Sequence, residues 1–398
     1  MKEKKNSGVH FGEQFHQVKR IELIKGGRDL FELLNKLIGQ ASFEIHIQFY
    51  ILENDDTGRP VIDALIDAAK KGVQVYLVLD SYGSSNLEEK EIEKMTTAGV
   101  RFKWFKPVIA LNNMEFGRRL HHKVVVIDEQ IALVTGVNIA DRYNDIHGHV
   151  AWLDFAMLVE GTTAGEIRLR CLQIWEQPHS FLKIKKKFSL PRIDRSLRSE
   201  NALVKVSVND WLRSRNDIYR GYKSAFQDAK QEIFIIGGYF LPGRGLRKNL
   251  KDASQRGVHI SVILTAVSDV RFAKSAEKYL YSWMLQNNIQ IYEWLPAVMH
   301  GKVAAVDCNW STVGSYNLNY LSNFESIELN LEIIDNRFST ELTTMMKDIA
   351  LNQCRRIFPE EFYRNYSMIK KIEMRFSYWF ARTTMRILNA FSRKPTIN

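Results

Sequence analysis

The sequence predicts an α/β protein made of two tandem domains with mostly parallel sheets, related by a pseudo-twofold axis and sharing one active site. Two repeats predict this architecture. The polar pattern H-x-K-x-x-x-x-D occurs at residues 121–128 and again at 300–307. A helix-period segment that stops at a glycine and leads into a β-branched strand also occurs twice, at Gly72 and at Gly257. Duplication of a whole α/β domain explains both repeats at once.

The first half alternates strand and helix along the chain. Apolar and polar side chains alternate over 43–51, as in a half-buried strand, whereas 60–71 carries its apolar residues on one side of a helix. In chain order, the expected elements are a helix at 27–34, a strand at 43–51, a helix at 60–71, a strand at 73–79, a helix at 87–97, strands at 100–105, 124–127 and 152–159, and a helix at 166–176. Strand, helix and strand in succession form a βαβ unit, whose strands are parallel.

The second half repeats this order. Its expected elements are a helix at 218–229, a strand at 232–236, a helix at 245–255, a strand at 258–264, a helix at 276–287 and a strand at 289–294. We therefore place a first domain at 1–180 and a second domain at 211–350. The stretch between them, 181–210, is rich in Lys and Arg and is expected to be a basic linker.

Two further segments combine basic residues with an uncertain role. An irregular connection is expected at 106–120, and its Arg118 and Arg119 either contact a phosphate or headgroup or are simply solvated. In the tail, 351–398, apolar residues recur near helical spacing from Ile369 onward, with Lys and Arg between them. This pattern fits a basic aromatic amphipathic helix at a membrane interface. A C-terminal helix packed on the globular body is the alternative.

The spacing within each motif has a physical meaning. Alternate side chains of an extended segment share a face, so His121 and Lys123 point together, as do His300 and Lys302. One His, one Lys and one Asp are expected to match this pattern by chance at roughly one start position in ten thousand. A solvated strand end would account for one copy. Two copies, each followed by a small-residue turn and an Asn, favour one polar site built from both halves.

Composition limits the function classes. The chain of 398 residues is 45% apolar and 25% charged, which are ordinary globular values and exclude intrinsic disorder. A net charge of +11 favours an anionic partner, but does not choose among a membrane surface, a nucleic acid and a phosphorylated substrate. The three scattered cysteines are typical of free thiols in a reducing compartment. No secretory signal and no transmembrane segment is visible, so any membrane contact is expected to be peripheral.

The double motif resembles the signature of the phospholipase D superfamily, whose members carry two HxKxxxxD motifs, each usually followed by Gly-Ser or Gly-Gly and then x-Asn. The second copy matches in full, including a Glu-x-Asn sequence at 328–330. The first copy has Thr135 and Gly136 where the family usually has Gly and many members have Ser. Stretches that look like the bacterial cardiolipin synthase branch lie at 68–75, 239–242, 256–258, 268–269, 314–319 and 328–330, within a likeness that covers 21–335.

The resemblance implies two phospholipase D-like domains, one shared site, and a reaction that needs neither metal nor cofactor. The expected catalytic residues are His121, Lys123, Asp128, His300, Lys302 and Asp307, and the expected phosphate-binding or supporting residues are Asn138, Ser315, Asn317 and Glu328. One histidine would attack phosphorus to give a phosphohistidine, while the other would serve as acid and then as base. By analogy with the family we take His121 as the nucleophile and His300 as the acid and base, although the symmetry of the sequence leaves the order open.

The resemblance also implies roles for the remaining residues. The lysines and asparagines would hold the nonbridging phosphoryl oxygens, and the two aspartates would orient or polarise the site. Glu328 would orient a histidine across the pseudo-twofold, and Asp154 sits at roughly the corresponding place in the first half. Six large residues near the rims could line a lipid cleft or pack in the core: Trp104, Phe105, Tyr239, Phe240, Trp294 and Leu295.

The function implied is that of a cardiolipin synthase at the cytoplasmic face of a bacterial membrane. A phosphatidyl group would pass from phosphatidylglycerol to a second phosphatidylglycerol, with loss of glycerol. A hydrolase of a phospholipid or nucleic-acid phosphodiester would differ only in using water as acceptor. A non-catalytic lipid-binding scaffold would not require both histidines and both lysines. The basic aromatic tail favours lipid over nucleic acid, and no feature indicates an oligomeric state.

Overall fold

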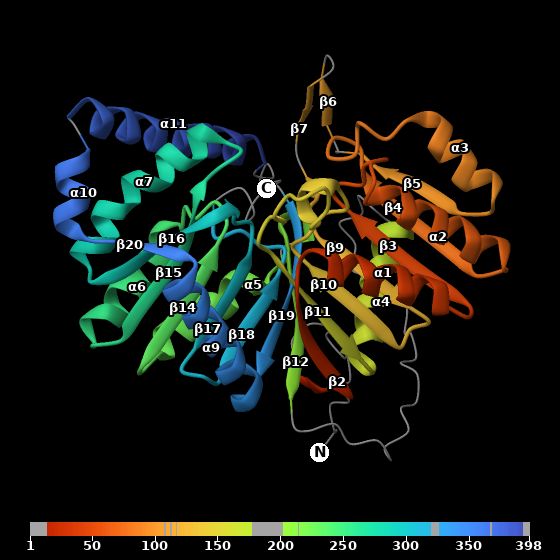
Figure 1. The fold of residues 1–398 in the computed structure, drawn as a ribbon, viewed down its shortest axis with the longest axis horizontal. Helices are drawn as coiled ribbons and strands as arrows, with labels where there is room; N and C mark the ends of the chain where they lie inside the picture. The colour runs from red at the N-terminus through yellow and green to blue at the C-terminus, as the bar shows by residue number, and fades with distance from the viewer. Residues whose placement is uncertain are drawn as a thin grey trace, which may run out of the picture.

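The computed structural model describes residues 14–106, 109–111, 114–116, 118–176, 202–213, 215–319, 326–366 and 368–392. Figure 1 shows two α/β halves side by side, each with a sheet that runs into the middle of the molecule. The predicted class, two tandem α/β domains, is confirmed. Among the described residues, no helix is both long and apolar enough to cross a membrane.

The first half is organised around a seven-stranded sheet. Its order is β2 (Arg20–Lys25), β11 (Phe155–Glu160), β10 (Ile131–Thr135), β9 (Lys123–Ile127), β3 (Glu44–Phe49), β4 (Gln74–Asp80) and β5 (Arg101–Phe105). Its helices are α1 (Arg28–Gln40), α2 (Gly58–Lys70), α3 (Glu89–Thr97) and α4 (Thr162–Glu176). Alternate residues of β9 serve two cores: Val125 and Ile127 pack with α1 and α2, whereas Val124 and Val126 face α4 and the second half.

The second half is organised around a larger sheet. Its path runs through β1 (His16–Gln17), β12 (Leu203–Asp210), β19 (Ser326–Ile334), β18 (Trp310–Gly314), β17 (Lys302–Val306), β14 (Glu232–Gly237), β15 (His259–Val267), β16 (Ile289–Val298) and β20 (Cys354–Ile357). The short strands β8 (Arg119–Leu120) and β13 (Arg215–Asn216) pair with β19 and β12. Its helices are α5 (Asp217–Asp228), α6 (Arg244–Gln255), α7 (Arg271–Gln286), α9 (Asn336–Asn352), α10 (Pro359–Asn365) and α11 (Met368–Ser392).

The prediction of mostly parallel sheets is wrong. Along the two sheet paths, parallel pairing is confined to β3, β4 and β5 and to β14, β15 and β16, and the other pairs are antiparallel. Off these paths, the short β8 pairs parallel with β19. The reason lies in the connections, because a parallel pair needs a long crossover whereas a tight turn gives an antiparallel pair. Each H-x-K-x-x-x-x-D strand leads into its neighbour through such a turn, with positive φ at Asp128 and Glu129 and at Asp307 and Cys308.

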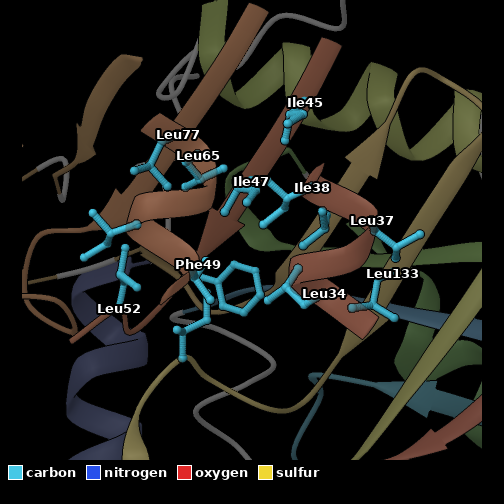
Figure 2. Packing of buried hydrophobic residues seen from close by; sticks show 14 of the residues in the cluster. Leu34, Leu37, Ile38, Ile45, Ile47, Phe49, Leu52, Leu65, Leu77 and Leu133 are labelled. Atoms are coloured by element: carbon cyan, nitrogen blue, oxygen red, sulfur yellow. The ribbon is translucent and has the colours of Figure 1, made fainter. Parts of the chain in front are cut away.

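One hydrophobic core joins the two halves. Strands β10 and β11 pack against β18 and β19, and Val124 and Phe155 share a buried cluster with Val303, Val313 and Leu329. A second core fills the space between the first sheet and helices α1 and α2, where Leu34 and Ile38 meet Ile45, Ile47 and Phe49 (Figure 2). The shared core fixes the two motifs relative to each other, which one site built from both halves requires.

Three predicted boundaries need correction. Residues 203–210, expected in the linker, form β12, because Val204, Val206 and Val208 alternate into the shared core. Residues 354–357, expected in the tail, form β20 at the edge of the sheet. The connection at 106–120, expected to be irregular, contains the hairpin of β6 (Ile109–Leu111) and β7 (Met114–Phe116) and the strand β8. The basic stretch 181–200 lies outside the described residues.

Candidate active site

Each motif begins at a strand that the other half holds in place. The backbone N–H groups of His121 and His122 donate to the carbonyl of Ile327, at 3.1 and 2.8 Å, where β8 runs parallel to β19. In the other direction, the N–H of His300 donates to the carbonyl of Leu153 at 2.8 Å. These reciprocal bonds bring both histidines to the boundary between the halves, as one shared site predicts.

The side chain of His121 is held by a carboxylate from the second half. Its Nδ1 lies 2.8 Å from Oε1 and 3.0 Å from Oε2 of Glu328, which is fully buried on β19. Ser315 donates its hydroxyl to Glu328 Oε2 at 2.5 Å, and the N–H of Leu329 donates to the Ser315 Oγ at 3.1 Å. A carboxylate only accepts hydrogen bonds, so Nδ1 carries the proton and Nε2 keeps a free lone pair.

The side chain of His300 is held by a carboxylate from the first half. Its Nδ1 lies 2.7 Å from Oδ2 of Asp154, which also accepts from the Phe155 N–H at 2.8 Å through Oδ1. A Cβ at Gly136 would come within 2.5 Å of both Asp154 carboxylate oxygens. A hydroxyl-bearing residue therefore does not fit at Gly136, and the first half has no counterpart of Ser315 at this position.

The two lysines are buried beside the histidines. Lys123 Nζ donates to the carbonyl of His121 at 2.6 Å, and its ammonium lies 5.4 Å from the centre of the Tyr50 ring. Lys302 Nζ donates to Asp154 Oδ2 at 3.2 Å and also contacts the carbonyl of His300. Burial lowers the pKa of Lys123 to about 7 and also lowers the pKa of Lys302.

Burial and the lysine charges both lower the pKa values of the two histidines. Burial, followed by the charge of Lys302, lowers the pKa of His300 to about 3. Burial also lowers the pKa of His121, while the charge of Glu328 opposes that shift. Although burial disfavours the ionised Asp154, the Lys302 ammonium keeps the pKa of that carboxyl below its ordinary value. Both imidazoles are therefore neutral near pH 7 in the unliganded protein, beside two lysines that can donate to a phosphate.

Comparison with known proteins identifies the family. Residues 34–154 and 222–350 match the family model described as the phospholipase D-like domain of cardiolipin synthase. Cardiolipin synthase B of Salmonella typhimurium is 32% identical over 341 residues, which cover 85% of this chain and 82% of the relative. Cardiolipin synthase B of Escherichia coli is 29% identical over 350 residues, with the same two shares covered. The chain belongs to the phospholipase D-like cardiolipin synthase family.

The family membership confirms the resemblance read from the double motif, and it makes the chain a phosphatidyltransferase of the phospholipase D superfamily. Among solved structures, phosphatidylserine synthase of Haemophilus influenzae matches with a TM-score of 0.70, over 95% of this chain and 97% of that one. The identity is 14%, so this likeness shows a common fold and carries no argument about substrate.

The two motif aspartates lie away from the histidines. Asp128 and Asp307 follow the far ends of β9 and β17, about 17 Å from the motif lysines at 3.3 Å per residue. Asp128 accepts from the N–H groups of residues 42–44, at 2.7, 2.9 and 2.9 Å, where β3 begins. Asp307 accepts from those of residues 230–232, each at 2.8 Å, where β14 begins. The expectation that these aspartates orient or polarise the site is not met by this geometry, which makes them caps of the neighbouring strands.

The two motif asparagines stand close to the site with different surroundings. Asn138 is fixed, because its Oδ1 accepts from the Ile51 N–H at 3.2 Å and its Nδ2 donates to the Tyr143 hydroxyl at 2.9 Å. Asn317 is also buried, but its Oδ1 has no hydrogen-bond partner within the described part of the chain. Asn317 is thus the member of the pair whose side-chain oxygen can still accept a hydrogen bond, from a ligand or from water.

Aromatic rings surround the two histidines unequally. Tyr143, Trp152 and Tyr239 have ring centres 5.6, 6.0 and 5.9 Å from that of His300. The ring of Tyr50 lies 5.0 Å from that of His121. The sequence indicated Tyr239 as a rim residue but not the other three. Tyr143 ends a short 3-10 helix, Trp152 lies in the segment before β11, and Tyr50 directly follows β3.

Most of the other residues considered for the rim or for phosphate contact are buried or partly buried. Phe105, Phe240 and Trp294 are buried in hydrophobic clusters, whereas Leu295 is exposed. Arg118 is fully buried against Asp210, with Nε 2.9 Å from Oδ1, so it is a structural ion pair. Arg119 is partly buried, 3.6 Å from Asp80 and stacked over Tyr82.

Proposed function

We propose that this protein transfers a phosphatidyl group from one phosphatidylglycerol to another, through a phosphohistidine on His121, and releases glycerol. The observation that carries the proposal is the buried Glu328 carboxylate against Nδ1 of His121, because it leaves Nε2 as a nucleophile in a fixed direction. We further propose that the enzyme works as a peripheral protein at the cytoplasmic face of a bacterial membrane.

The first step forms the covalent intermediate. Nε2 of His121 attacks phosphorus and the bond from phosphorus to the glycerol oxygen breaks, while protonated His300 gives its proton to that oxygen. Lys123 and Lys302 hold the nonbridging oxygens as negative charge grows on them, and the Nδ2 group of Asn317 is a further donor to them. The products are phosphatidyl-His121, free glycerol and neutral His300.

The second step reverses the roles. His300 takes the proton from a hydroxyl of the second phosphatidylglycerol, whose oxygen attacks phosphorus and displaces His121. His300 must therefore be protonated when substrate binds, although its pKa is about 3 in the unliganded site. A phosphodiester between Lys123 and Lys302 adds a negative charge there, which offsets their effect and raises the pKa of His300.

Hydrolysis is the alternative outcome of the same chemistry. If water takes the place of the acceptor alcohol, a phospholipid gives phosphatidic acid, and a nucleic-acid phosphodiester would be cleaved likewise. The three rings around His300 favour transfer, because they give the proposed general base apolar surroundings that suit a lipid alcohol better than water.

The test is incubation of the purified protein with phosphatidylglycerol in mixed micelles, with lipid products and glycerol quantified. We expect cardiolipin and glycerol in equal amounts, and loss of both in His121→Ala and His300→Ala. His259→Ala is the matched control, because His259 is exposed and begins β15 opposite Glu232, at the end of the sheet where Asp307 lies. Phosphatidic acid as the sole lipid product would assign the protein to the hydrolases. Turnover of a single-stranded oligonucleotide without turnover of lipid would make it a nuclease.

The covalent step has its own test. Intact-mass measurement after acid-free quenching should show one phosphatidyl adduct on the wild type, and none on His121→Ala. An adduct that persists in His121→Ala and disappears in His300→Ala would exchange the roles of the two histidines.

A further inference from the structure

One side of α11 carries a stripe of large apolar side chains that nothing within the described residues covers. Ile369, Ile372, Phe376, Trp379 and Phe380 are each between 50% and 79% exposed. At about 100° per residue, these five positions fall within about 100° of the helix circumference. We call these five residues the α11 stripe.

The opposite side of α11 is fixed on the body of the protein. Met374 and Ser377 are buried, and the ring of Tyr378 stacks on that of Tyr279 of α7, with centres 4.7 Å apart and planes 26° from parallel. Figure 1 shows α11 lying along α7 over the second half. The helix is therefore packed on the globular body, as one of the two sequence readings proposed, yet its most apolar side faces outward.

The stripe is continuous with the active site. Phe380 meets Phe272, in the first turn of α7, edge to face at 5.5 Å. Immediately before that turn, Asp269 accepts a hydrogen bond from the Tyr239 hydroxyl at 2.6 Å, and the Tyr239 ring lies 5.9 Å from that of His300. Three contacts thus lead from the stripe to the second catalytic histidine.

The charge around the stripe indicates what covers it. Within α11 five residues are basic and only Glu373 is acidic. By helical position Arg375 falls beside one edge of the stripe, with Lys371 farther round on the same side, and Glu373 falls beside the other edge. Two copies of this chain joined by their stripes would bring these basic helices together, because a twofold interface pairs a surface with itself. Exposed Phe, Trp and Ile beside Lys and Arg are instead suited to the interface of an anionic bilayer.

We propose that the α11 stripe, extended by the exposed Val267 at the end of β15 and the exposed Val270 just before α7, docks the enzyme on an anionic lipid bilayer. The apolar side chains enter the acyl boundary and the basic ones meet lipid phosphates. Docking there places the mouth of the site beside headgroups, so phosphatidylglycerol reaches His300 without leaving the interface. This inference deepens the proposed function, because it names the surface through which that site meets its lipid.

The test is vesicle cosedimentation of the full chain, with phosphatidylcholine vesicles and with vesicles that also contain phosphatidylglycerol. We expect the wild type to prefer the anionic vesicles, and the double variant Phe376→Ser, Trp379→Ser to have a partition coefficient lower by about tenfold or more. The variant Lys371→Glu, Arg375→Glu should lose the preference for anionic vesicles. Phe43→Ser is the matched control, because Phe43 is 52% exposed and precedes β3 at the end away from the site.

Binding of the Phe376→Ser, Trp379→Ser variant at the wild-type level would overturn the inference. A change from dimer to monomer in sedimentation velocity caused by the same variant would also overturn it, since the stripe would then be an interface between copies. Thermal melting of each variant shows whether it is folded. Cosedimentation involves no turnover, so a wild type that binds vesicles but makes no cardiolipin contradicts the proposed function and leaves the docking surface standing.

Discussion

The position of Asp128 predicts that its replacement lowers stability and leaves catalysis unchanged, whereas the motif suggests a loss of catalysis. Its carboxylate accepts three backbone N–H groups at 2.7–2.9 Å, and its φ is +49°. Two of these bonds are exposed and one is partly buried, so their loss costs about 2 kcal/mol in total. Alanine at a left-handed φ costs about 1 kcal/mol more. Asp128→Ala should therefore lower the free energy of unfolding by about 3 kcal/mol.

The assay separates stability from catalysis. A loss of about 3 kcal/mol corresponds to a melting temperature lower by about 6–12 °C for a domain of this size. The value of kcat for lipid transfer, measured well below the melting temperature, should stay within about twofold of the wild type. Asp128→Asn, which tolerates the left-handed φ and keeps an acceptor oxygen, should lose less stability. Asp63→Ala, at an exposed carboxylate 3.0 Å from Lys94, should change neither quantity appreciably. A kcat reduced more than tenfold in Asp128→Ala without a change in melting would refute this reasoning and restore Asp128 to the catalytic site.

Three further predictions concern the site itself. Glu328→Gln should reduce kcat by about 10²–10⁴-fold, because an amide can hold His121 in the wrong tautomer. The rate of phosphohistidine formation in a single turnover measures this loss, and an unchanged rate would contradict the prediction. The plot of log(kcat/KM) against pH should fall more steeply above about pH 7, because Lys123 loses its proton as pH rises through its pKa of about 7, in addition to the proton that His300 must carry. In Lys123→Arg this added steepness should be absent, since guanidinium stays charged. Gly136→Ala should lower both the melting temperature and kcat, because the new Cβ would press on the Asp154 carboxylate. A variant with the wild-type melting temperature and kcat would show instead that Asp154 can move aside.

Much of the fold was predictable because local patterns agree with the tertiary structure. The helix that ends at Gly72 and the strand that follows it were read from apolar periodicity, and Gly72 adopts a φ of +93°, which glycine accommodates freely. The direction of pairing was not predictable in the same way. Hairpins such as the one at Asp128 and Glu129 depend on two residues with positive φ, and neither is a glycine or an asparagine that would have signalled the turn.

The site was predictable where chemistry and spacing coincide. His121, Lys123, His300 and Lys302 come together, and Glu328 reaches across to His121 as expected. Asp128 and its counterpart were misplaced, because a motif read as one unit does not distinguish a catalytic residue from one that closes a turn. The rings of Tyr143 and Trp152 could not be assigned, since their approach to His300 depends on how the two halves pack, which no local pattern encodes.

The exchange of carboxylates between the halves has a consequence during synthesis. His121 and its partner Glu328 are separated by 207 positions, so the ribosome must finish most of the chain before the proposed nucleophile is oriented. Asp154, in contrast, is made long before the His300 that it will hold. A nascent first half that folds on its own would therefore carry an intact motif and no activity. The proposed lipid transfer cannot begin until the second half has docked against the first.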